Sequence, residues 1–108
     1  MYDHANLPVF QKSYDLYKKL TQERIHIPKI ERYHLWLHIE TESLRIIELI
    51  IESQHVTEIE KLGIIRNMSK SIDLLRIFVR LAHETDILSK DKYLNLEQDV
   101  DTIGRMLG

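Results

Sequence analysis

Apolar residues recur along the chain at steps of three and four, which is the spacing of one face of an α-helix. Near the C-terminal end this row consists of Tyr93, Leu96, Val100, Ile103 and Leu107. The segment before it carries a second row, made of Ile65, Met68, Ile72, Leu75, Val79 and Ala82. A third stripe near the N-terminal end holds Val9, Leu16, Leu20 and Ile27. The pattern predicts amphipathic helices that pack against one another along apolar seams.

Prolines and capping residues predict where these helices begin. Pro8 and Pro28 each suit the first turn of a helix. Thr57 followed by Glu60 has the form of a capping box, and Ser89 suits an N-cap. The predicted helices span residues 8–26, 28–55, 58–85 and 89–107. Because short connections favour antiparallel neighbours, the predicted fold is all-α: one domain, residues 1–108, built as an antiparallel up-down-up-down four-helix bundle.

The predicted helix over residues 28–55 is apolar over a wider arc than one bundle contact requires. The apolar residues that form this arc, Ile46, Ile47, Leu49, Ile50 and Ile51, cover about 200° of the helix wheel at about 100° per residue. A stripe of roughly 100° is enough for an amphipathic bundle helix. Deep burial of a central helix explains this arc, and so does a contact between subunits. The residues predicted for such an oligomer interface are Ile46, Ile47, Ile50 and Ile51.

Charge is distributed unevenly along the chain, although the formal net charge is only −2. Residues 10–34 and 61–83 are net basic, whereas residues 35–60 and 84–108 are net acidic. Alternation of this kind favours an assembly or polyanion-binding module over a small-molecule enzyme. The absence of cysteine from the sequence excludes disulfides, thiolate metal sites and a cysteine nucleophile. Neither a signal peptide nor a membrane span is evident, so we expect a cytoplasmic protein with no membrane partner.

Histidines and glutamates suggest a metal site at first sight. His34, His38 and Glu42 share one helix face, a spacing that can bind zinc. Two Glu-x-x-His pairs, starting at Glu31 and Glu52, resemble the ligands of di-iron bundles. Both pairs lie on the same predicted helix, about 30 Å apart at 1.5 Å per residue, so they cannot share one centre. We therefore predict no metal and no cofactor, and, with no nucleophile constellation or glycine-rich phosphate loop, no enzymatic activity.

Basic residues are the better candidates for function, because phosphates or an acidic partner surface would contact them. The predicted third helix carries one stripe and a neighbouring row, consisting of Arg76, Arg80, His83, Arg66 and Lys70. The N-terminal part contributes Lys12, Lys18, Lys19, Arg24, Lys29 and Arg32. Asp73, one turn before Arg76, is placed to neutralise it in part. The alternative interpretation is a solvated helix face, which is what most charged rows are.

Several short motifs, taken in order, resemble a known family. They are Leu7-Pro8 before Tyr14-Asp15-Leu16-Tyr17, Ile27-Pro28-Lys29 before Glu31-Arg32-Tyr33, Leu74-Leu75-Arg76 before Val79-Arg80-Leu81-Ala82-His83, and the closing Ile103-Gly104-Arg105-Met106-Leu107-Gly108. Their order and spacing resemble the Avd-like four-helix-bundle family, over nearly the whole chain. That family includes the accessory variability determinants of diversity-generating retroelements and the proteins of intervening sequences in bacterial ribosomal RNA genes.

The resemblance implies a bundle that assembles into a homopentameric ring. It also implies an accessory role without catalysis, in which the ring binds the reverse transcriptase and the template RNA and supports mutagenic retrohoming. Arg76 and Arg80 match the arginines of the family pattern and are the first candidates for partner contact. Retroelement members are expected to be strongly basic, whereas this chain is slightly acidic. Three alternatives stay open: a protein of the ribosomal intervening-sequence type, a structural oligomer whose alternating charges pair the helices, and a small metal-binding bundle that uses His34, His38 and Glu42.

Overall fold

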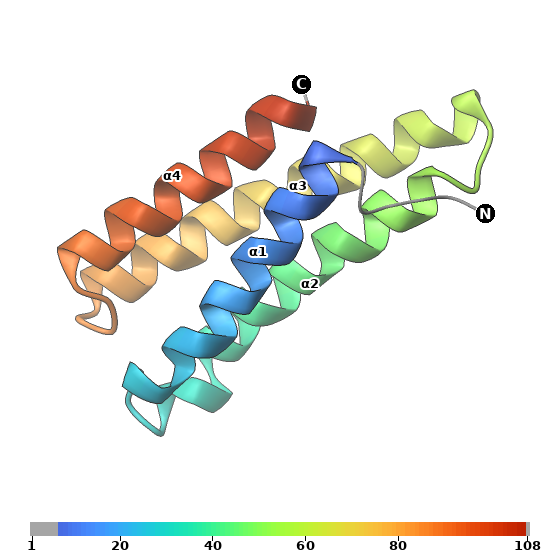
Figure 1. Cartoon of the computed structure of the whole chain (residues 1–108). Helices are drawn as coiled ribbons and strands as arrows, with labels where there is room; N and C mark the ends of the chain where they lie inside the picture. Colours follow the sequence, from blue (N-terminus) through green and yellow to red (C-terminus); the bar gives the residue numbers. More distant parts are fainter. Residues whose placement is uncertain (1–6, 108) are drawn as a thin grey trace.

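Four α-helices and two short 3-10 turns make up the computed structural model, which describes residues 7–107 (Figure 1). The elements are α1 (Pro8–Glu23), η2 (Arg24–His26), η3 (Glu31–Tyr33), α2 (Leu35–Ser53), α3 (Glu58–Glu84) and α4 (Lys90–Leu107). Each helix packs against the next along the chain, and α4 packs against α1. The predicted all-helical, up-and-down arrangement of four helices is confirmed, and no β-strand occurs within residues 7–107.

The helix starts predicted from capping residues are confirmed for the second half of the chain. Thr57 Oγ1 accepts a hydrogen bond from the Glu60 amide at 3.3 Å, and the Glu60 carboxylate accepts one from the Thr57 amide. At the start of α4 the Ser89 hydroxyl accepts from the Lys92 amide at 3.3 Å. These side chains satisfy amides that have no partner within the helix, so each start is fixed by its local sequence.

The second predicted helix begins later than expected, at Leu35 and not at Pro28. Ile27 is extended (φ −87°, ψ 138°), as the residue before a proline usually is. Pro28 then opens a tight turn, in which its carbonyl accepts from the Glu31 amide at 2.9 Å. The Arg32 guanidinium donates to the carbonyls of Ile27 and Ile25 at 2.9 and 3.0 Å and holds this turn. The prediction of helix from residue 28 onward was wrong because proline also suits the start of a turn.

The core is built from the predicted apolar seams, and most apolar side chains of the wide arc of α2 are buried in it. Trp36, at the start of α2, is fully buried, and its indole N–H donates to the Leu20 carbonyl at 3.3 Å. Ile46, Ile47 and Ile50 are buried within the single chain. These three side chains therefore leave little surface for a neighbouring subunit to contact. The arc is wide because α2 packs against both α1 and α3.

The connection from α3 to α4 contains the one non-glycine residue with positive φ among residues 7–107, Asp86 at 65°. The Ile87 amide donates to the Ala82 carbonyl at 2.7 Å and the Asp86 amide to the His83 carbonyl at 3.1 Å. This is the Schellman pattern, whose left-handed position normally holds glycine. An aspartate tolerates that conformation better than most residues, but it still carries a steric cost.

Replacing Asp86 with glycine is therefore expected to stabilise the fold by up to about 1 kcal/mol, because glycine removes the Cβ from a left-handed position. Thermal unfolding followed by circular dichroism measures the change. Asn67→Gly, at an exposed position inside α3, is the matched control and should lower the melting temperature. A lower melting temperature for Asp86→Gly would contradict this account of the turn.

Candidate functional site

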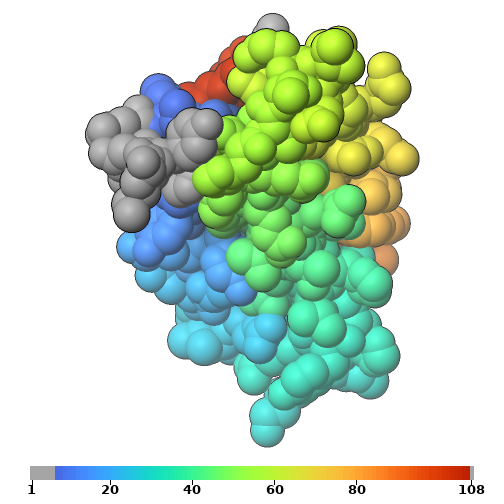
Figure 2. Space-filling view, turned by 90° about the vertical axis from the view of Figure 1, so that its right-hand side faces the viewer, coloured from blue at the N-terminus to red at the C-terminus, as the bar shows by residue number. Residues whose placement is uncertain are grey.

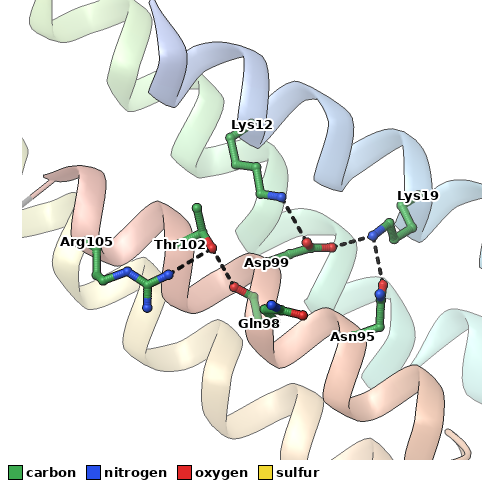
Figure 3. Close-up of polar contacts among 7 residues, drawn as sticks. All are labelled: Lys12, Lys19, Asn95, Gln98, Asp99, Thr102 and Arg105. Atoms are coloured by element: carbon green, nitrogen blue, oxygen red, sulfur yellow. Dashed lines mark hydrogen bonds and ion pairs between the residues drawn. The ribbon is translucent and has the colours of Figure 1, made fainter.

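Two of the predicted binding lysines of α1 are turned toward α4 and share one buried carboxylate (Figure 3). Asp99 is only 8% exposed, and its two oxygens lie 3.0 Å from Lys12 Nζ and 2.5 Å from Lys19 Nζ. Lys19 also donates to the Asn95 side-chain oxygen at 2.8 Å. Removing either lysine would leave a buried charge with less compensation, which is unfavourable. Lys12 and Lys19 therefore connect α1 to α4, and their charges are partly cancelled inside the protein.

Arg24 and Arg32 also have partners within the chain. The Arg24 guanidinium meets Glu40 of α2 through two hydrogen bonds, one from Nε at 3.1 Å and one from Nη2. Glu40 is 3% exposed, so the pair is partly shielded from water. The hydrogen bond to Glu40 raises the pKa of Arg24 above its ordinary value. Arg32 donates to the backbone carbonyls described above, so both arginines hold the segment between α1 and α2.

Arg76 lies between two carboxylates on the outer side of α3. Its Nε donates to Asp101 of α4 at 2.9 Å, and its Nη1 donates to Asp73 at 3.2 Å. The predicted partial neutralisation by Asp73 is confirmed. A Cβ added at Gly104 would stand 2.8 Å from Arg76 Nη2, so the glycine of the closing motif leaves room for this guanidinium. Two motifs that lie far apart in the sequence therefore meet at this point.

Arg80 has a different environment from Arg76, one turn away. It is exposed and forms neither a hydrogen bond nor an ion pair with any residue from 7 to 107. Nearby, the Tyr93 hydroxyl donates to Glu97 at 2.6 Å, and this hydrogen bond, with burial, raises the pKa of Tyr93. His83 stacks on the Tyr93 ring, with centroids 4.7 Å apart and planes 6° apart, so it packs inside the protein more than it faces solvent.

A groove runs between α3 and α4 past these residues. One hollow, of about 400 Å³, is lined by Asp73, Arg76, Ile77, Arg80, Tyr93 and Glu97. A second, of about 270 Å³, is lined by Ile65, Ser69, Ile72, Asp73, Arg76, Gly104 and Leu107. Because Asp73 and Arg76 line both, the two hollows lie side by side. We call them together the α3–α4 groove: Ile65, Ile72 and Leu107 line one end, and Arg80, which forms no ion pair with a described residue, lies at the other end.

Four other predicted cations keep their charges exposed. Lys18 lies over the Tyr14 ring, 5.6 Å from its centroid. Lys29, Arg66 and Lys70 are exposed and have no ion pair within the part of the chain that the structure describes. Arg45 of α2 shares this condition and was missed by the sequence analysis, because it is the single cation in the acidic segment 35–60. Its exposed position could have been found only by asking which side chains of α2 face away from the core.

The histidine pattern forms no metal centre. Among residues 7–107 there is no group of three histidine, aspartate or glutamate side chains close enough to hold an ion. His38 packs against Phe78 of α3, with ring centroids 6.0 Å apart. None of the helices in that range combines the length and apolar character needed to cross a membrane.

An exposed apolar row replaces the buried isoleucines as a candidate subunit contact. Leu37, Leu44 and Ile51 follow one another at seven-residue steps, so they share one face of α2. Leu37 and Leu44 are 42% and 40% exposed, and Ile51 is half-buried. Figure 2 shows α2 (green) lying open between α1 (blue) and α3 (yellow to orange) on this side of the molecule.

Comparison with known protein families bears on the whole of this arrangement. A family model described as bAvd-like matches residues 8–108, a range that includes all four helices and the α3–α4 groove. No curated protein sequence matches the chain. The resemblance inferred from the short motifs is thereby confirmed.

Proposed function

The chain belongs to the bAvd-like family, and we propose that it is a non-catalytic accessory protein of a diversity-generating retroelement. In this proposal it acts in the cytoplasm, binds the reverse transcriptase and the template RNA, and supports mutagenic retrohoming. The observation that carries the proposal is the unpaired Arg80 in the α3–α4 groove, at a position that matches the family pattern. A cation beside the exposed apolar side chain of Ile77 suits a protein segment that offers a carboxylate and an apolar side chain.

Arg76 and Arg80 have different roles in this proposal. Arg76 is a positioning residue, because its bonds to Asp73 and Asp101 hold α4 against α3 and shape the groove. Arg80 is the contact residue, because its guanidinium forms neither a hydrogen bond nor an ion pair within residues 7–107. Substituting either arginine should weaken the complex with the reverse transcriptase, but only the substitution of Arg76 should also lower the stability of the fold.

Arg80→Glu is expected to lower affinity for the reverse transcriptase encoded in the same locus at least tenfold, about 1.4 kcal/mol, with an unchanged melting temperature. Affinity is measured by interferometry with immobilised enzyme. Lys90→Glu reverses an equally exposed cation away from the groove and should change affinity less than about threefold. Arg76→Ala should lower both affinity and melting temperature. Equal affinities for Arg80→Glu and the unaltered protein would count against the groove as the contact.

We also propose that the protein forms the homopentameric ring implied by the family, with the exposed α2 row of Leu37, Leu44 and Ile51 in the subunit interface. Two of the three side chains expose about two fifths of their surface in the single chain, and burying them would contribute favourably to association. Of the four isoleucines predicted for the interface, Ile51 is the one that is not buried.

Leu44→Glu should convert the oligomer into monomers, because it places a charge in an apolar contact. Sedimentation velocity gives the mass of the species, and circular dichroism checks that the monomer is folded. Ile59→Glu alters an even more exposed apolar residue, at the start of α3, and should leave the oligomer intact. An unchanged sedimentation coefficient for folded Leu44→Glu would exclude this row from the interface.

One observation supports a second function. Lys12, Lys19, Arg24 and Arg76 all have carboxylate partners inside the chain. Such pairing is what a structural oligomer or an intervening-sequence protein without a retroelement role would need. This alternative predicts no binding of the reverse transcriptase and no salt-dependent binding of RNA at micromolar protein.

A further inference from the structure

Three cations without ion-pair partners gather on the outer side of the α2–α3 pair: Arg45 of α2, and Arg66 and Lys70 of α3. We infer that this group, which we call the α2–α3 cation cluster, binds the phosphate backbone of single-stranded RNA. The inference rests on the proposed function, since it locates the RNA contact of the same accessory protein. It adds Arg45 to the candidate RNA-binding residues and places the RNA surface apart from the α3–α4 groove.

The contact between α2 and α3 places the three residues together. His38 and Phe78 touch across the two helices, so these positions lie level. Arg45 is seven residues further along α2, about 10 Å, and Lys70 is eight residues back along α3, about 12 Å. Because the helices are antiparallel, both steps run the same way along the bundle and bring Arg45 and Lys70 to one level. Arg66 follows one turn beyond Lys70, about 6 Å further.

The three residues also share a side of the molecule. The seven-residue step from His38 to Arg45 returns to the same face of α2. On α3, Phe78, Leu74, Lys70 and Arg66 follow one another at four-residue steps, a ridge that turns gradually outward. Exposure increases along this ridge: Phe78 is half-buried, Leu74 is 40% exposed, and both cations are exposed. The cluster therefore faces solvent on the surface where α2 and α3 meet.

The acidic side chains nearest along the chain do not cancel this charge. Asp73, one turn from Lys70, is bound to Arg76. Glu42, one turn before Arg45, has one carboxylate oxygen buried without a hydrogen-bond partner, so that oxygen points inward. Glu48, three residues after Arg45, and Glu52 are both exposed on α2, and neither forms an ion pair with a described cation. The α1 lysines that face α4, Lys12 and Lys19, have a carboxylate partner. The cluster residues Arg45, Arg66 and Lys70 have none within the described part of the chain.

The arrangement suits a polyanion better than a small ligand. None of the three cations lines the hollows of the α3–α4 groove. Long side chains with exposed tips can follow successive phosphates without a fixed pocket, and phosphate contacts of this kind carry little sequence information. Leu74 and Leu81 are 40% exposed nearby, so an apolar protein surface is the competing occupant that an experiment must separate from RNA.

The test uses the full chain and a fluorescein-labelled 20-nucleotide RNA of mixed sequence, with anisotropy measured between 50 and 300 mM KCl. The triple variant Arg45→Gln, Arg66→Gln, Lys70→Gln should lower affinity at least tenfold at 100 mM salt. The slope of log affinity against log salt should fall by about 2, since each neutralised phosphate of a single strand contributes about 0.7. Arg45→Gln alone should lower the slope by about 0.7.

The matched control replaces three exposed cations of α4, Lys90, Lys92 and Arg105, with glutamine and should keep the salt slope of the unaltered protein. Equal losses in both triple variants would overturn the cluster, because binding would then follow total charge. Loss of binding on Leu74→Ser with Leu81→Ser, but not in the cation triple, would overturn it in favour of an apolar partner. RNA binding that survives the triple variant refutes this inference alone. No RNA binding by the unaltered protein refutes the RNA part of the proposed function as well.

Discussion

The carboxylates that lie between helices determine which cations of this protein are available to partners. Asp99 is the clearest case, because it is nearly buried and both of its oxygens accept from α1 lysines. Glu40 does the same for Arg24, and Asp101 for Arg76. The alternation of charge along the sequence is therefore largely explained by packing: basic and acidic segments lie side by side in the bundle. The cations available to binding partners are the few that this pairing leaves without a carboxylate.

The remaining features divide among three surfaces of one small bundle. The α3–α4 groove carries an exposed arginine, the α2 row is apolar, and the α2–α3 cation cluster is basic. Separate surfaces of this kind suit a protein that connects partners and does no chemistry itself. Gly104 contributes to the first surface, because a Cβ at this position would crowd the Arg76 guanidinium.

Features set by local sequence were predictable, and features set by long-range pairing were not. The caps at Thr57 and Ser89 depend on residues three positions away, and both were correctly predicted. The start of α2 was wrong, because Pro28 suits a turn and a helix equally well. Lys12 and Asp99 are 87 residues apart in the chain, so no spacing rule could reveal their contact. The wide apolar arc of α2 is visible in the sequence, but only the packing of both neighbouring helices shows that its isoleucines belong to the core.

The central claim, that internal carboxylates hold some cations and leave others free, can be tested on the lysines directly. Brief acylation with a limiting amine-reactive ester, quantified at each site by mass spectrometry, compares them in one sample. Lys12 and Lys19 should react several-fold more slowly than Lys29 and Lys70, because acylation requires the nitrogen to leave its carboxylate partner. The difference should vanish in urea. Equal rates at all four lysines in the folded protein would contradict the account.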